Sequence, residues 1–251
     1  MAFRSGNPAL TSKTFEQYTR AGAAAEPMTI EGTVNKTGFL LALLIVSAAW
    51  PWTRFFGSGQ NVAAVMPFIW GGAIGGLVLA VITVFKKTAA PITGPLYAVA
   101  EGLALGGLSA YFEAQFHLIV IQAVGLTFGT LAALLIAYRS GLIKATENFK
   151  LGVVAATGGI ALFYIVALGL GFFGIRIGFL HEGTTAGILF SVFVVIIAAL
   201  NLVLDFDFIE SGVEAGAPKW LEWYAAFGLL VTLVWLYLEI LRLLAKSRSR
   251  R

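Results

Sequence analysis

The sequence predicts an all-α integral membrane protein that crosses the bilayer seven times. Of its 251 residues, 59% are hydrophobic and only 12% are charged, and the mean hydropathy is +0.87. A soluble domain carries roughly 25% charged residues, so this chain has too few polar side chains to cover a surface in water. Its apolar residues form continuous runs, without the period-two alternation of membrane β-strands. The chain therefore belongs in lipid, as helices.

Each predicted helix rests on a run of about 20 mostly apolar residues, the length that spans a bilayer. Short loops that contain most of the charged residues separate the runs. The predicted spans are Gly38–Phe56, Val62–Phe85, Pro91–Phe112, Phe116–Tyr138, Leu151–Phe173, Thr184–Leu204 and a last one within Trp220–Leu244. The chain then divides into a polar N-terminal arm (1–36), a membrane domain (37–246) and a basic tail (247–251).

Positive charge predicts the orientation, because cytoplasmic loops carry an excess of Lys and Arg. If the N-terminus is cytoplasmic, the outer loops hold only Arg54 and Arg176. The inner segments then hold Arg4, Lys13, Arg20, Lys36, Lys86, Lys87, Arg139, Lys144, Lys150 and Lys219. We therefore predict a multi-pass protein with its N-terminal arm in the cytoplasm.

The basic tail conflicts with this orientation, because seven full spans would place it outside. Its residues Lys246, Arg248, Arg250 and Arg251 are interpreted as an anchor on the membrane surface. Either the last helix overrides the charge rule, or the segment 220–228 lies at the membrane interface or re-enters it. The sequence WLEWY at Trp220–Tyr224 favours an interfacial aromatic belt.

Glycine is frequent, with 29 residues, and several occur at a spacing of four. Small residues at this spacing let helices approach closely in lipid, which predicts a compact bundle. The pairs are Gly72 with Gly76, Gly102 with Gly106, and Gly125 with Gly129.

Several function classes lack the residues they need. Cysteine is absent, and the two histidines, His117 and His181, fall in predicted outer loops without metal-ligand spacing. No Gly-rich phosphate loop, nucleophile triad or zinc motif occurs, and no basic patch with interleaved aromatics points to nucleic acid. We expect neither an enzyme nor a cofactor.

Acidic residues within the apolar runs are the candidate functional residues, because an ionised group inside a bilayer costs about 2.5–3.5 kcal/mol or more. Asp205 shares a face with Asn201 and with small residues, a face that should look into the bundle. Asp207 is rotated by about 200° and should leave the membrane towards the head groups. For Asp205, a functional and a structural role remain equally open.

Two further acids, Glu101 and Glu239, lie in the middle of apolar runs. Glu101 has a structural alternative, as a neutral acid that hydrogen-bonds a neighbouring helix. Glu239 is either an acid shared between helices or the local ion-pair partner of Arg242, one turn further on. We favour the first alternative for Glu239.

The sequence resembles the Bax inhibitor (transmembrane Bax-inhibitor motif) family in its bacterial form. The resemblance rests on LDFDFIESG at 204–212 and LVWLYLEILRLLAK at 233–246. It implies seven helices with the last one central between two three-helix layers, in a bacterial cytoplasmic membrane. It also implies a pH-sensitive Ca²⁺ leak gated by acids of the last two helices. On the family pattern these are Asp205, four residues before Ile209, and Glu239, which follows Leu-Tyr-Leu.

The position of this pair depends on where the last helix begins. From Trp220, Glu239 would lie about 28 Å along the helix, too far for contact with Asp205. From Gly228 the distance is about 16 Å, and Glu101 should then be a near neighbour of Glu239, with Asp205 below both. We adopt the second geometry as the expectation.

The resulting functional hypothesis is a proton-regulated Ca²⁺ leak channel with Asp205, Glu239 and Glu101 as pH-sensing acids. Asn201 and Arg242 support them, and Asp205 with Glu239 would be transient Ca²⁺ ligands, since close carboxylates share a proton when neutralised and offer hard oxygens when ionised. The alternative is a non-conducting regulator that binds a membrane protein, such as a membrane-anchored protease, through its polar arm. A secondary transporter is a third hypothesis, which the lack of repeated halves disfavours.

Overall fold

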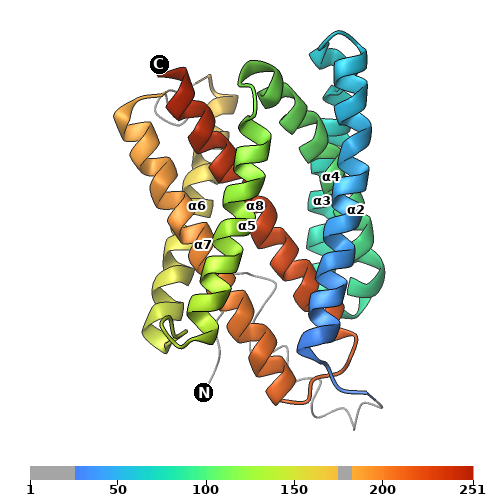
Figure 1. The fold of residues 1–251 in the computed structure, drawn as a ribbon, viewed down its shortest axis with the longest axis vertical. Coiled ribbons are helices and arrows are strands. Elements are labelled where there is room, and N and C mark those ends of the chain that lie inside the picture. The colour runs from blue at the N-terminus through green and yellow to red at the C-terminus, as the bar shows by residue number, and fades with distance from the viewer. Residues whose placement is uncertain (1–25, 175–182, 251) are drawn as a thin grey trace.

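The described part of the chain forms seven long helices (Figure 1). The computed structural model describes residues 26–174 and 183–250. The helices are α2 (Ile30–Gly57), α3 (Met66–Phe85), α4 (Ala90–Gln115), α5 (Ile119–Arg139), α6 (Glu147–Phe172), α7 (Thr185–Glu214) and α8 (Leu221–Ser249), with short 3₁₀ turns η1 (Val62–Ala64) and η2 (Lys87–Ala89). The only β-pairing among the described residues is an isolated bridge between Pro27 and Pro218. His181, Arg176 and residues 1–25 of the predicted arm lie outside the described residues.

The predicted fold class, an all-α membrane protein, is confirmed. Six of the described helices are long and apolar enough to cross a membrane, and many large apolar side chains on α2, α3, α5 and α6 are exposed, as expected of a surface that faces hydrocarbon. The helix outside this set is α4, which is 26 residues long but less apolar. It packs against α2, α3 and α8, while Ile92, Leu96 and Val99 near its start remain exposed.

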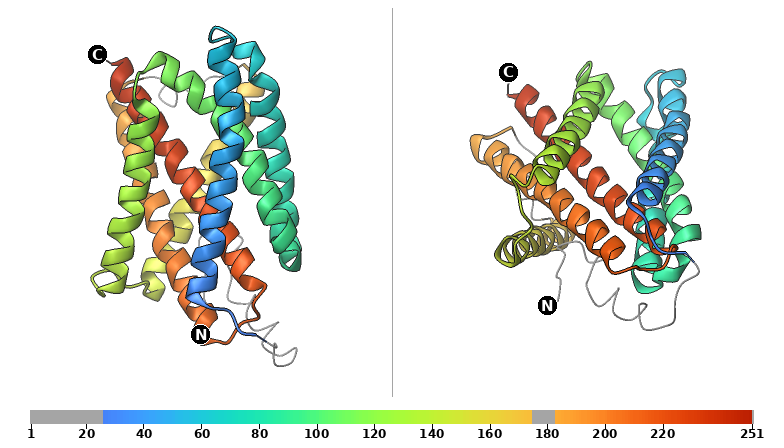
Figure 2. Two further views of the ribbon diagram at one scale, coloured as in Figure 1. Left: turned by 45° about the vertical axis from the view of Figure 1, so that its right-hand side comes forward. Right: turned by 60° about the horizontal axis from the view of Figure 1, so that its bottom comes forward.

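Two layers of three helices enclose the last helix. Helices α2, α3 and α4 pack together as one layer, and α5 and α6 pack on α7 as the other. Helix α8 contacts α2, α4, α5 and α7, and its side chains are the most buried of all (Figures 1 and 2). The expected central position of the last helix is therefore observed.

Helix α8 is continuous from Leu221 to Ser249, which corrects the expected interfacial segment. Leu221, Tyr224 and Phe227 are fully buried in the main core, and Trp220 and Trp223 pack against it. An aromatic-rich stretch can line a membrane interface or fill a protein core, and here the neighbouring helices cover it. Of the two alternatives for the tail, the structure shows the full-length helix.

Two of the four tail residues, Lys246 and Arg248, bind protein groups, which corrects their interpretation as a lipid anchor. Lys246 is buried and donates to the Gly187 carbonyl at 3.3 Å and to Ser191 Oγ at 2.9 Å, both on α7. Arg248 donates to the His117 carbonyl and to Gln122 Oε1, each at 2.7 Å. These bonds tie the end of α8 to α7 and to the start of α5.

Two of the three predicted glycine pairs are close-contact sites. A Cβ atom at Gly106 would overlap the carbonyl oxygen of Ala48 on α2. A Cβ atom at Gly102 would overlap Ser47 Oγ and the Leu44 carbonyl oxygen. Gly72 and Gly76 of α3 are similarly close to α4. The third pair is different, because a Cβ at Gly125 or Gly129 would meet nothing within 4 Å. The spacing alone does not show which helix faces have a partner.

Gly106→Ala is expected to lower the stability of the folded bundle by about 1–3 kcal/mol, since the added methyl group forces α2 and α4 apart. Gly129→Ala is the matched control, and it should be neutral or stabilising by up to about 1 kcal/mol because Ala favours helix more than Gly does. Thermal unfolding in detergent micelles measures both. Equal melting temperatures for the two variants would contradict the close contact.

Candidate functional site

The carboxylate of Glu239 lies at the centre of a polar cluster between α8 and α6. Its side chain is 3% exposed, and Oε1 accepts from Arg242 Nη1 at 2.7 Å and from the Tyr164 hydroxyl at 3.1 Å. Arg242 Nη1 also donates to the Tyr164 oxygen at 2.9 Å, and the guanidinium lies 5.5 Å from the centre of the Tyr164 ring. Three groups from two helices therefore share one hydrogen-bonded triangle.

This cluster decides between the two alternatives for Glu239. The structure shows the ion pair with Arg242 and adds a link to Tyr164 of α6, so Glu239 is not shared with another acid. Its second oxygen, Oε2, is buried and has no hydrogen-bond partner among the described residues. An ionised carboxylate with one bonded oxygen is held in place but poorly solvated, and it loses its main partner when it is protonated.

Asp205 is fully buried in the second half of α7, the helix that packs most extensively on α8. One turn earlier on the predicted face, Asn201 is 2% exposed and donates to Thr157 Oγ1 of α6 and to the Ile197 carbonyl, each at 2.8 Å. Asn201 therefore joins α7 to α6. The prediction that this small, polar face looks into the bundle is observed.

Asp205 and Glu239 lie at different depths. Helices α7 and α8 run in opposite directions from the turn at 215–220. Asp205 is about 14 Å along α7 from this turn, whereas Glu239 is about 27 Å along α8. Neither oxygen of Glu239 is hydrogen-bonded to Asp205. The expected height of about 16 Å for Glu239 is therefore too small, because it assumed that α8 begins near Gly228 and not at Leu221.

Glu101 faces away from Glu239, which corrects the expectation that the two are neighbours. A Cβ atom placed on Gly76 of α3 would lie 2.7 Å from Glu101 Oε2, so the carboxylate occupies the space that this glycine leaves open. Glu239 faces α6 in the opposite layer. Among the described residues, no hydrogen bond or ion pair joins Glu101 to another side chain.

Asp207 was predicted to leave the membrane towards the head groups, but in the structure it is paired with a lysine of α6. Its Oδ2 atom lies 2.7 Å from Lys150 Nζ in the first turn of α6, and the Lys150 side chain is 5% exposed. Nearby, the Tyr138 hydroxyl of α5 donates to Glu210 Oε2 at 2.5 Å. These polar contacts connect α5, α6 and α7 at the end of the bundle where α8 begins.

Sequence reasoning missed a third buried acid, Glu222, in the first turn of α8. It is fully buried and accepts from the Thr29 backbone N–H at 2.9 Å, from Thr29 Oγ1 at 3.0 Å and from Lys36 Nζ. Beside it, Lys219 pairs with Glu26, and Met28 N donates to the Ala217 carbonyl at 2.7 Å. The sequence feature that could have indicated these contacts is the presence of oppositely charged residues in the arm and around the start of α8.

No group of three or more His, Asp or Glu side chains within the described ranges is arranged to hold a metal ion. Each of these acids instead has its own surroundings: the partly buried Glu101 lies against α3, Asp205 is buried within the second half of α7, and Glu239 lies against α6. Such sites can bind and release a proton or contact a passing cation one carboxylate at a time. They are suited to transient, rather than resident, cation binding.

The fold and these acids define a polytopic membrane protein whose central helix carries buried ionisable groups. The family model described as Bax inhibitor 1 like matches residues 7–249. The chain belongs to this family. No curated protein and no solved structure matches it in the corresponding comparisons.

Proposed function

We propose that the protein is a Ca²⁺ leak channel that protons regulate. The observation that carries this proposal is the complete burial of Asp205 and Glu239 on the two helices at the centre of the bundle. Ionisable groups are rarely placed at such positions without a role, because their burial in a membrane destabilises the protein. Membership of the family supports the same activity.

In this proposal Asp205 of α7 and Glu239 of α8 act one after the other, at different depths of the bundle. Their separation along α7 and α8 is too large for a shared proton, so the two acids act as separate sites. Protonation of Glu239 removes its charge attraction to Arg242 and weakens the link between α8 and Tyr164 of α6. Ionised, each acid offers hard oxygen ligands to a Ca²⁺ ion passing through.

The direct test is Ca²⁺ flux into proteoliposomes that contain this protein alone, measured between pH 5 and 8, the range in which buried carboxyl groups commonly titrate. We expect a flux that depends on pH and requires the protein. Flux equal to that of empty liposomes at every pH would overturn the proposal.

Asp205→Asn is expected to flatten the pH dependence of this flux, because it removes a fully buried carboxyl group from α7, the helix that packs most extensively on α8. Asp207→Asn is the control two residues away, and it should leave the pH dependence intact. It should instead reduce stability by about 1–3 kcal/mol, since it leaves buried Lys150 without its closest carboxylate. Flux profiles and melting temperatures are measured on both variants. Equal flux effects would refute the distinct role of Asp205.

The N-terminal arm is placed on the cytoplasmic side in this proposal. The starts of α2, α4, α6 and α8 lie at one end of the bundle (Figure 2), and these segments hold most of the loop lysines. The chain lacks cysteine, so a cysteine at Ser12 or Ser58 is unique. An impermeant thiol reagent applied to intact cells should label Ser58→Cys and not Ser12→Cys. The reverse pattern would invert the orientation.

A second candidate function is regulation of another membrane protein through the arm. It is favoured by the contacts that fasten residues 26–36 to the first turn of α8, since a partner that pulls on the arm acts directly on the central helix. Deleting residues 2–24 leaves these contacts in place. A leak channel should retain its flux after this deletion, whereas a docking regulator should lose its partner.

A further inference from the structure

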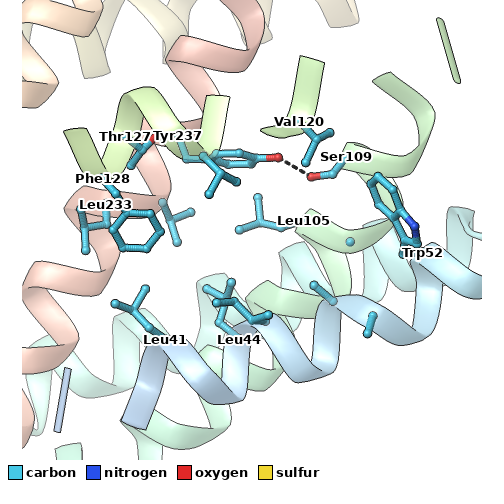
Figure 3. A pocket seen from close by; sticks show the side chains of 16 residues that line it. Leu41, Leu44, Trp52, Leu105, Ser109, Val120, Thr127, Phe128, Leu233 and Tyr237 are labelled. Atoms are coloured by element: carbon cyan, nitrogen blue, oxygen red, sulfur yellow. Dashed lines mark hydrogen bonds between the residues drawn. The ribbon is translucent and has the colours of Figure 1, made fainter. Parts of the chain in front are cut away.

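An elongated cavity lies beside the central helix and opens sideways between α2 and α5 (Figure 3). Its volume is about 350 Å³, within the range of small-molecule sites. Leu105 and Ser109 of α4 and Leu233 and Tyr237 of α8 form the inner wall. Helices α2 and α5 make little contact with each other, so the gap between them forms the mouth.

The mouth opens into the bilayer and not into water. Ile45 and Ala49 of α2 and Phe128 of α5 are exposed at the opening, and all three lie well inside helices that are apolar enough to span a membrane. A molecule that enters there must come from the hydrocarbon region. The lining is almost entirely apolar, which excludes a charged occupant.

The length and direction of the cavity match half of a bilayer. Its α2 lining runs from Leu41 to Trp52, about 16 Å along the helix axis, and the hydrocarbon core of one leaflet is about 15 Å thick. It extends from the bundle centre towards the end where α2 finishes and α5 begins. The outer end holds Trp52, Val120 and the Ser109–Tyr237 hydroxyl pair, whose oxygens are 2.6 Å apart.

We propose that this cavity binds one acyl chain of a membrane lipid, taken from the leaflet on the side where α8 ends. The chain inserts between α2 and α5 and packs on Leu233, Val234 and Tyr237 of α8. It thereby fills the space next to the central helix. This proposal is independent of ion conduction.

Photolabelling tests the proposal directly, because no residue of α8 between Leu221 and Lys246 is exposed. The full chain is reconstituted in phosphatidylcholine vesicles with a phosphatidylcholine that carries a diazirine near the end of one acyl chain. After irradiation, mass spectrometry of the digested protein locates the adducts. We expect adducts on Leu233, Val234 and Tyr237, the α8 residues that line the cavity. Adducts confined to the exposed faces of α2 and α5 would overturn the proposal.

Two blocking variants, each with a control on the same helix, make the test specific. Val124→Phe on α5 and Ala49→Phe on α2 place a ring in the cavity, and either should reduce the α8 adducts about tenfold through overpacking. Leu126→Phe and Val46→Phe add the same ring to exposed positions outside the lining and should leave the adducts unchanged. Unchanged α8 labelling in both blocking variants would show that the chain reaches α8 by another route.

Discussion

Glu239→Gln is expected to make Ca²⁺ flux independent of pH. Gln resembles the protonated acid in size and hydrogen bonding but has no charge to attract Arg242. The variant should therefore show, at every pH, the flux that the unmodified protein shows when acidified. Proteoliposome flux between pH 5 and 8 measures this result, with protein level and melting temperature recorded alongside.

Two companion variants separate a switch from a merely structural ion pair. Arg242→Gln removes the other charge of the pair and should also flatten the pH profile. Tyr164→Phe keeps both charges but deletes the hydroxyl link to α6 on which protonation is proposed to act, so it should also flatten the pH profile. A normal pH profile in Glu239→Gln, at normal protein levels, would remove Glu239 from the switch and leave Asp205 and Glu101 as the acids to test.

Glu222→Ala is expected to destabilise the bundle by about 3 kcal/mol or more, the usual result of removing one partner from a buried ion pair. The substitution leaves Lys36 unpaired and the Thr29 N–H without its acceptor. Thermal unfolding in detergent gives the effect, and Glu31→Ala, an exposed acid in the first turn of α2, is the control. A melting temperature equal to that of the control would show that the arm contributes little to holding α8.

Gly32→Ala tests the same contact from the other side. A Cβ atom at position 32 would overlap the Glu222 carboxylate, so the variant should displace this acid without removing its charge. We expect a destabilisation of about 1–3 kcal/mol. The double variant Gly32→Ala, Glu222→Ala should be less destabilised than the sum of the two single variants, since the overlap is gone.

The helices were predicted well from the sequence, because a long continuous apolar run in lipid can satisfy its own backbone hydrogen bonds only as an α-helix. The first six predicted spans each coincide with a described helix, and α2, α4, α6 and α7 are longer than predicted. Helices α3 and α5 begin later than predicted, at Met66 and Ile119. Helix α2 begins at Ile30 rather than Gly38 because Thr29 caps it, accepting from Gly32 N at 2.9 Å. A cap of this kind adds polar helical turns that a hydropathy window does not detect.

The contacts between helices were predicted less well, for two physical reasons. Depth depends on where a helix begins, and WLEWY has a composition that suits both a membrane interface and a buried first turn of α8. Side-chain direction also depends on the neighbour: Asp207 was assigned to the head groups because its partner Lys150 is 57 residues away in sequence. The burial of Asp205 was predictable because the small and polar residues on its helix face are close in sequence and can be recognised without knowledge of the partner helix.

The length of α8 makes bilayer thickness a variable in its own right. Its 29 residues extend about 43 Å, well beyond a hydrocarbon core of about 30 Å, and the helix runs obliquely through the bundle (Figure 2). Lipids with longer tails form a thicker bilayer and favour a more upright helix, whereas lipids with shorter tails favour a larger tilt from the bilayer normal. Because α8 contacts helices of both layers, such a change in tilt reaches both layers at once. Acyl chain length in a reconstituted membrane is therefore expected to act on this protein as a mechanical input.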